Sequence, residues 1–142
     1  MAELSSETIA AGCVSLDGKG VLIEAKSDDC RTDLLLRLID RGATLVSDAR
    51  TICRRHDRTL VASPPADAAG RIDIRGIGTV EREHFEQAPV ALLIVALDAA
   101  PRMPEERRVR RIAGVDVPVL ALGPLDPAAP IKVELALKAF TA

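Results

Sequence analysis

A short polar segment, Ala25-Lys26-Ser27-Asp28-Asp29-Cys30-Arg31-Thr32, carries residue types that could bind a phosphate group. It lies between a strand-like run and a helix-like run, which is the setting of a phosphate-binding loop. In the motif GxxxxGK[ST], glycines let backbone N–H groups approach the phosphates, the lysine neutralises charge and the hydroxyl binds magnesium. Only Thr32 matches strictly, and no residue from 21 to 41 is glycine. The motif alone therefore does not establish a nucleotide site.

The same segment has a simpler interpretation as the start of a helix. Ser27, Asp28 and Asp29 are common capping residues, because their side-chain oxygens accept the free N–H groups of a first turn. Arg31 keeps a positive charge, but a planar guanidinium is a poor substitute for a compact ammonium between two phosphates. The two aspartates would each repel a phosphate charge at ~4 Å by about 1 kcal/mol even in water. These residues favour helix capping without a nucleotide.

Hydrophobic periodicity predicts the elements that position this segment. A hairpin is expected over residues 8–25, and a helix over about 30–41 that stops at Gly42. The strands expected after it are 43–46, 51–54, 59–62, 71–75, 90–97, 109–112 and 117–122. A last helix is expected over about 129–140, with Pro130 in its first turn. This order predicts an α/β or α+β fold, with the run 90–97 as a central buried strand.

Composition restricts the classes of function. The chain has 142 residues, enough for one globular domain, with 48% hydrophobic residues and a net charge of −2. Phe85 and Phe140 are its only Phe, Tyr or Trp residues, which excludes base-stacking nucleic-acid modules. Three cysteines without a CxxC pair argue against a zinc site, and no segment is long and apolar enough to cross a bilayer. We expect a cytoplasmic protein with no nucleic-acid or membrane partner.

Several stretches together resemble the HPr kinase/phosphorylase family, whose members phosphorylate a serine of the phosphocarrier protein HPr in phosphotransferase-system regulation. The family pattern is close to GVLI-GPSGSGKSDLALRLIDRGA-LVADDR. The stretches that resemble it around the altered loop are Gly20–Ile23, Thr32–Leu34, Leu36–Ala43 and Leu45–Arg50. Ile72–Gly78 resembles the signature strand E-(V/I)-R-G-(L/I)-G, and Arg102-Met103-Pro104 resembles an R-L-P element. The resemblance covers about residues 9–140.

The resemblance implies a fold, cofactors and partners. The fold is a P-loop HPr kinase/phosphorylase-like domain in one unit, 1–142, with a mixed sheet, a helix after the loop at 25–32 and a C-terminal helix. ATP and Mg²⁺ are the implied cofactors. An HPr-like phosphocarrier is the implied partner. Family members commonly form hexamers, so the resemblance also implies a homo-oligomer.

The resemblance also implies roles for individual residues. The nucleotide would contact a degenerate loop made of Lys26, Ser27, Cys30, Arg31 and Thr32. In an active enzyme, Thr32 and Asp73 would hold the metal, and Asp48 would act as the catalytic base or as a metal ligand. The residues implied in partner binding are Arg75, Gly76, Gly78 and Arg102.

The departures from the family pattern fall on the chemistry. The loop lacks glycine, and Cys30 stands at the position of its last glycine. Of the family's acidic pair Asp48 remains, while Ala49 stands at the second place. The signature glutamate is replaced by Asp73, and the histidine of the family's early strand has no counterpart. Taken without the family, Asp48 and Asp73 are typical of solvent-facing strand ends.

Three functions stay open at this point. The favoured one is a catalytically impaired member of the family, a pseudo-kinase that binds an HPr-like carrier or a related kinase. The second is an active ATP- and Mg-dependent protein serine kinase/phosphorylase acting on HPr. The third is a nucleotide-independent module that keeps only the fold. The first is favoured because the loop has lost its glycines and gained the pair Asp28-Asp29.

Overall fold

The computed structural model describes residues 5–96, 108–123 and 126–141, in which one helix follows the first three strands and a second helix follows the last strand. The strands are β1 (Ser6–Ile9), β2 (Gly12–Leu16), β3 (Lys19–Ala25), β4 (Thr44–Ser47), β5 (Thr51–His56), β6 (Thr59–Ser63), β7 (Arg71–Ile74), β8 (Gly78–Glu81), β9 (Ala88–Ala96), β10 (Arg108–Ile112) and β11 (Val115–Leu122). The helices are α1 (Asp28–Asp40) and α2 (Ala129–Thr141). No helix within the described ranges is long and apolar enough to span a membrane.

A curled, mixed sheet runs through the molecule in the order β1-β5-β6-β9-β3-β2-β4, and β11 with β10 extends it from β9. The run Leu92–Ile94 in β9 is fully buried, and β9 pairs in parallel with both β3 and β11. The first residues of β9 also pair with β6 in antiparallel fashion. The predicted central strand and the predicted mixed α/β fold are therefore confirmed.

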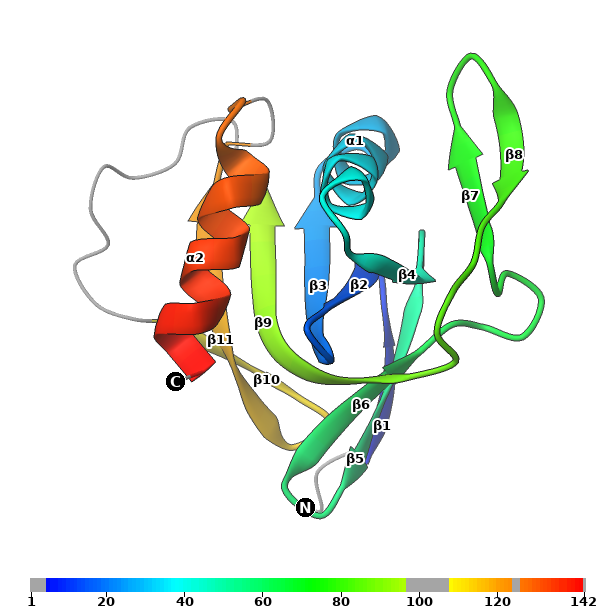
Figure 1. Ribbon diagram of the computed structural model, residues 1–142. Helices are drawn as coiled ribbons and strands as arrows, with labels where there is room; N and C mark the ends of the chain where they lie inside the picture. Colours follow the sequence, from blue (N-terminus) through cyan, green and yellow to red (C-terminus); the bar gives the residue numbers. More distant parts are fainter. Residues whose placement is uncertain (1–4, 97–107, 124–125, 142) are drawn as a thin grey trace.

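Both helices lie on one face of the sheet, as Figure 1 shows. The core between helices and sheet contains Ile23, Leu34, Leu35, Leu38, Ile94, Val133 and Leu137. A second core fills the opposite face, where the sheet curls, and contains Cys13, Leu22, Cys53, Leu60, Leu93, Ile112 and Val117. The buried residues of the first core are aliphatic, with the partly buried Phe140 packed against them, and those of the second core are aliphatic residues and two cysteines.

The helix α1 begins at Asp28, two residues before the expected start, because Ser27 caps it. The Cys30 N–H donates to Ser27 Oγ at 3.1 Å, which satisfies one of the free donors of the first turn. The helix ends before Gly42, whose φ of 108° is a left-handed conformation that favours glycine. Capping of this helix by Ser27 and its end before Gly42 are confirmed.

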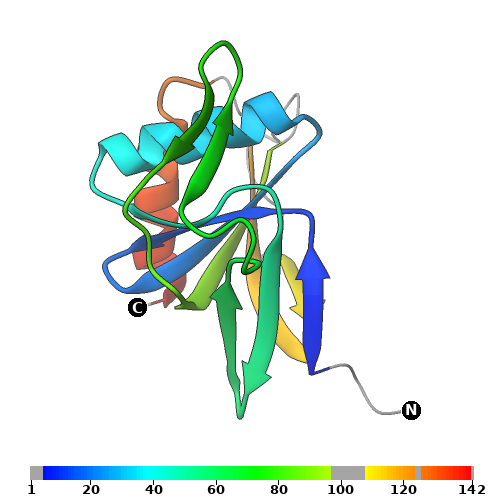
Figure 2. The same cartoon turned by 90° about the vertical axis from the view of Figure 1, so that its right-hand side faces the viewer.

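The strands β7 and β8 form a hairpin with its own two-stranded sheet, separate from the main one. Figure 2 shows this hairpin lying beside α1, at the opposite end of the molecule from the tips of β5 and β6. The predicted strand at 71–75 is present as β7, but β8 and the short N-terminal strand β1 were not predicted. The predicted strands at 109–112 and 117–122 are present as β10 and β11, which pair in antiparallel fashion. Leu97 and Arg102 lie outside the described residues.

Candidate functional site

The segment predicted to bind phosphate is a connection of two residues, Lys26 and Ser27, between β3 and α1. Residues 28–31 form the first turn of the helix instead of an open loop. The Arg31 N–H donates to the Ser27 carbonyl at 3.2 Å, and the Cys30 N–H is used by the Ser27 side chain. None of residues 25–32 has a positive φ. The turn therefore lacks the left-handed positions of a phosphate cradle, and two of its N–H groups are used within the chain.

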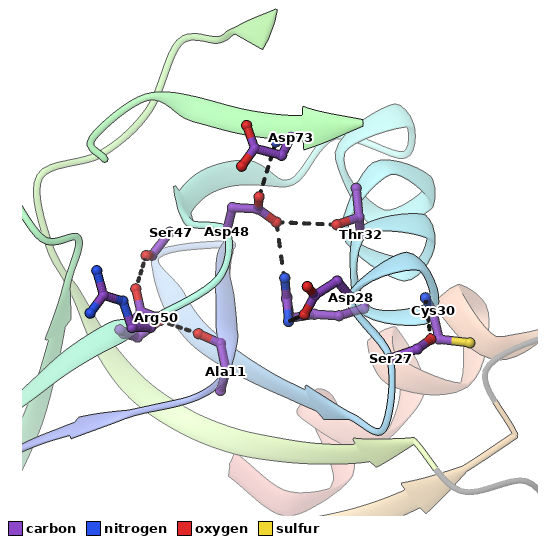
Figure 3. A network of polar contacts seen from close by, with 11 residues as sticks. Ala11, Ser27, Asp28, Cys30, Thr32, Ser47, Asp48, Arg50 and Asp73 are labelled. Atoms are coloured by element: carbon purple, nitrogen blue, oxygen red, sulfur yellow. Dashed lines mark hydrogen bonds and ion pairs between the residues drawn. The ribbon is translucent and has the colours of Figure 1, made fainter. Parts of the chain in front are cut away.

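Asp48, just after β4, is the centre of the polar network drawn in Figure 3. Its Oδ1 accepts a hydrogen bond from Thr32 Oγ1 at 3.3 Å, and its Oδ2 accepts one from the Asp73 N–H at 3.1 Å. The structure thus brings together Thr32, Asp48 and Asp73, which the family resemblance had singled out. Asp48 is only 7% exposed, so its interpretation as a solvent-facing strand end is wrong, whereas Asp73 is exposed as that interpretation expects.

Arg31 turns inward and is only 6% exposed. One terminal nitrogen lies 2.8 Å from Asp28 Oδ1, and its Nε lies 4.0 Å from Asp48 Oδ1. This Nε is buried and has no hydrogen-bond partner within the described residues. The guanidinium is therefore positioned between two carboxylates of its own chain and not toward an open phosphate site.

The second aspartate of the loop is also paired. Asp29 Oδ2 lies 2.7 Å from a terminal nitrogen of Arg75, at the end of β7. Its hydrogen bond raises the pKa of the Arg75 guanidinium above the ordinary value. Both groups are largely exposed, so this ion pair contributes little stability by itself. The two aspartates expected to repel a nucleotide are thus the partners of two arginines.

Close backbone packing holds Asp48 in place. A Cβ at Gly12, the first residue of β2, would lie 2.6 Å from the Asp48 carbonyl oxygen, so a larger residue does not fit there. The Ser47 hydroxyl donates to the Arg50 carbonyl and closes the turn that contains Asp48. Sequence reasoning missed Gly12, although a glycine at a strand indicates a close backbone approach.

The remaining predicted residues are dispersed. Lys26 and Ser27 are exposed and Cys30 is half-buried. Lys26 lines a hollow of about 170 Å³ together with Glu24, Ala25, Val95 and Ala96, which is smaller than usual ligand pockets. Arg75, Gly76 and Gly78 lie exposed at the tip of the β7–β8 hairpin, and Arg102 is outside the described residues.

Several of the oxygens that would hold a magnesium–nucleotide group already accept hydrogen bonds within the chain. Magnesium requires near-octahedral oxygen ligands, usually one or two carboxylates with substrate phosphates. Both oxygens of Asp48 already accept hydrogen bonds, and Asp73 Oδ1 accepts one from Thr79 Oγ1 at 2.7 Å. Among the residues that the structure describes, no three His, Cys, Asp or Glu side chains converge to hold a metal ion. Sequence reasoning also missed Thr79, which lies in the unpredicted strand β8.

Comparisons with known proteins agree with one another. Residues 2–133 match the family model described as HPr Serine kinase C-terminal domain. The HPr kinase/phosphorylase of Chlorobium phaeobacteroides is 30% identical over 140 residues, with 89% of this chain and 41% of the relative covered. That of Chlorobium luteolum is 32% identical over 143 residues, with 89% and 42% covered. This chain therefore spans about two fifths of the length of these relatives.

A solved structure matches this chain over a larger share of its own length than the two Chlorobium relatives do. It is the HPr(Ser) kinase/phosphatase from Coxiella burnetii, which is 28% identical and superposes with a TM-score of 0.81. The match covers 94% of this chain and 89% of that one. The curled sheet and the C-terminal helix described above are thus part of a shared fold.

Proposed function

This chain belongs to the family of the HPr serine kinase C-terminal domain, and from that premise we propose that it is a pseudo-kinase that binds an HPr-like carrier protein without using ATP. Relatives of this chain carry the name HPr kinase/phosphorylase. The protein surface that recognises the carrier is retained in this proposal, and the nucleotide chemistry is lost. A related kinase chain is the other partner that the family resemblance implies.

The observation that carries the proposal is the helical first turn at residues 28–31. Opening this turn into a phosphate cradle would remove the Ser27 cap, which contributes about 1 kcal/mol. Each non-glycine residue moved to a left-handed conformation would cost roughly 1–2 kcal/mol more. Asp28 and Asp29 would also have to leave their arginines and face the phosphates. All these free-energy costs would have to be offset by contacts with the nucleotide, so they weaken the affinity for ATP.

The hairpin tip, residues Arg75–Gly78, supports the protein-binding half of the proposal. Ile77 at this tip is 74% exposed, the largest exposed fraction among the large hydrophobic side chains of the described residues. Gly76 and Gly78 flank it with φ values of 88° and 106°, so the tip is built from left-handed glycine positions. An apolar side chain presented on a fixed turn is a suitable contact for another protein.

Calorimetric titration with Mg-ATP tests the loss of nucleotide binding. We expect no saturable heat up to millimolar nucleotide, and saturable binding in the micromolar range would contradict the proposal. A parallel titration with a purified HPr-like carrier tests the binding half, for which we expect a saturable complex. If neither the carrier nor a related kinase binds at high protein concentration, the chain keeps only the fold.

A further inference from the structure

Asp48 poses an electrostatic problem that the fold has to solve. Its carboxylate is buried, and a buried carboxylate is unfavourable unless hydrogen bonds and a countercharge compensate the loss of water. Two hydrogen bonds come from Thr32 and from the Asp73 N–H. The countercharge beside it comes from Arg31, at 4.0 Å, a residue that is itself buried.

The Asp73 N–H belongs to β7, so its bond to Asp48 attaches the β7–β8 hairpin to the body of the protein. The hairpin has a sheet of its own and no share in the ladder of the main sheet. A second polar attachment joins the hairpin to α1 through the Arg75–Asp29 pair, in which the Arg75 side chain is 85% exposed. An exposed pair of this kind contributes little, so the part-buried hydrogen bond to the Asp48 carboxylate is the stronger of these two attachments.

We propose that Arg31 is an internal cation that holds the Asp48 carboxylate and, through it, positions the β7–β8 hairpin. Arg31 is a positioning residue in this role and contacts no ligand. The hairpin is thereby ordered before any partner arrives, which lowers the entropy cost of binding. The inference rests on the proposed function in one respect, since it takes the hairpin tip as the surface that meets the partner.

Amide hydrogen exchange of the full chain, without nucleotide or partner, tests this role. Arg31→Met keeps much of the side-chain length and removes the charge, and we expect the Asp73 amide to exchange at least tenfold faster. Arg31→Lys restores a cation and should recover part of the protection. Arg75→Met removes the exposed attachment and should change the Asp73 rate less than threefold. Amides of β3 and β9 are the internal reference and should stay unchanged.

The double variant Arg31→Met/Asp48→Asn separates this role from simple packing. It removes both buried charges, while the asparagine oxygen can still accept the Asp73 N–H. We expect the Asp73 amide to exchange more slowly in the double variant than the product of the rate increases in Arg31→Met and Asp48→Asn predicts. Multiplicative effects, or an unchanged Asp73 rate in Arg31→Met, would overturn the inference. If Arg31→Met alone does not fold, recovery of folding in the double variant supports the inference, and failure to recover contradicts it.

The two proposals can fail separately. Binding of Mg-ATP would overturn the proposed function but would leave the exchange rates of the unliganded chain as they are. Loss of the Arg31 effect would overturn only the positioning role.

Discussion

Thr32 and Asp48 lie 16 residues apart in the chain and meet through a hydrogen bond of 3.3 Å between Thr32 Oγ1 and Asp48 Oδ1. The bond joins the second turn of α1 to the end of β4. A hydroxyl and a carboxylate that could serve a metal are here bonded to each other. The residues that the family resemblance implies lie together, and the Thr32 hydroxyl and both Asp48 carboxylate oxygens are hydrogen-bonded within the chain.

Restoring a glycine-rich loop should restore nucleotide binding if the rest of the scaffold is intact. The variant combines Asp28→Gly, Asp29→Gly, Cys30→Gly and Arg31→Lys, and we expect its affinity for Mg-ATP to rise at least tenfold in calorimetry. The reason is that the first turn would lose its helix-forming residues and its two negative charges. Arg31→Lys alone is the matched control and should gain nothing, because the helical turn persists. A gain from this single change would show that the turn is not the obstacle.

Ile77→Asp should weaken the complex with an HPr-like carrier at least tenfold, since it places a charge on the exposed apolar contact of the hairpin tip. Val109→Asp is the matched control, because Val109 is also exposed, at 60%, but lies on β10 at the other end of the molecule. Surface plasmon resonance with both variants measures the effect. Equal weakening by the two substitutions would remove the hairpin tip from the interface.

Ser27→Ala should lower the free energy of unfolding by about 1 kcal/mol, because the Cys30 N–H loses its partner at the start of α1. Ser27→Asp keeps an oxygen at the capping position and should stay close to the wild type. Urea denaturation followed by circular dichroism measures both. If the alanine and aspartate variants have the same free energy of unfolding, the capping hydrogen bond does not stabilise the protein.

Gly12→Ala should destabilise the protein by about 1–3 kcal/mol, the usual range for overpacking. The new methyl group would lie 2.6 Å from the Asp48 carbonyl oxygen and 2.8 Å from a Leu35 methyl carbon. Gly123→Ala is a suitable control, since a Cβ there meets nothing within 4 Å. Thermal unfolding should separate the two variants, and a Gly12→Ala protein as stable as the control would mean that β2 can move away from Asp48 freely.

The protein should lose stability in alkali because of two buried thiols. Burial raises the pKa of Cys53 from 9.0 to about 12. The pKa of Cys13 is raised more strongly, by its complete burial and by the charge of the neighbouring Cys53 thiolate. Between pH 9 and 12 the folded state holds protons that the unfolded chain releases. The free energy of unfolding therefore falls as the pH rises, by up to about 1.4 kcal/mol per pH unit for each thiol.

Urea unfolding at pH 8, 9 and 10 measures this slope. The chain contains no tyrosine, so no phenol titrates in the same window. Cys53→Ala should flatten the pH dependence whatever it does to the stability at pH 8. An unchanged slope in this variant would rule out Cys53 as a source.

Much of the fold could be predicted because its longer elements have clear periodicity. The helix α1 has an apolar stripe between a capping serine and Gly42, and β9 is an apolar run of strand length. The short strands β1 and β8 could not be predicted in this way. Each has four residues, mostly polar and exposed, and is defined by its pairing partner more than by its own sequence.

The candidate site was predictable only in part. The family resemblance named Thr32, Asp48 and Asp73, and the structure places them in hydrogen-bond contact, while their function stays a prediction. The inward turn of Arg31 was not foreseen. The orientation of the Arg31 side chain depends on the position of Asp48 in the folded protein. This tertiary relationship cannot be predicted from the sequence around Arg31. Only the ion pair of Arg31 with Asp28 could be predicted locally, because the two residues are three positions apart on one helix.

The separate sheet of the β7–β8 hairpin has a consequence for how this protein could change over evolutionary time. Its two strands pair with each other and lie beside α1, whereas both hydrophobic cores are built around the main sheet. Substitutions at the tip therefore alter what the hairpin recognises at small cost to global stability. The hairpin can in this way acquire a new binding partner while the rest of the domain stays unchanged.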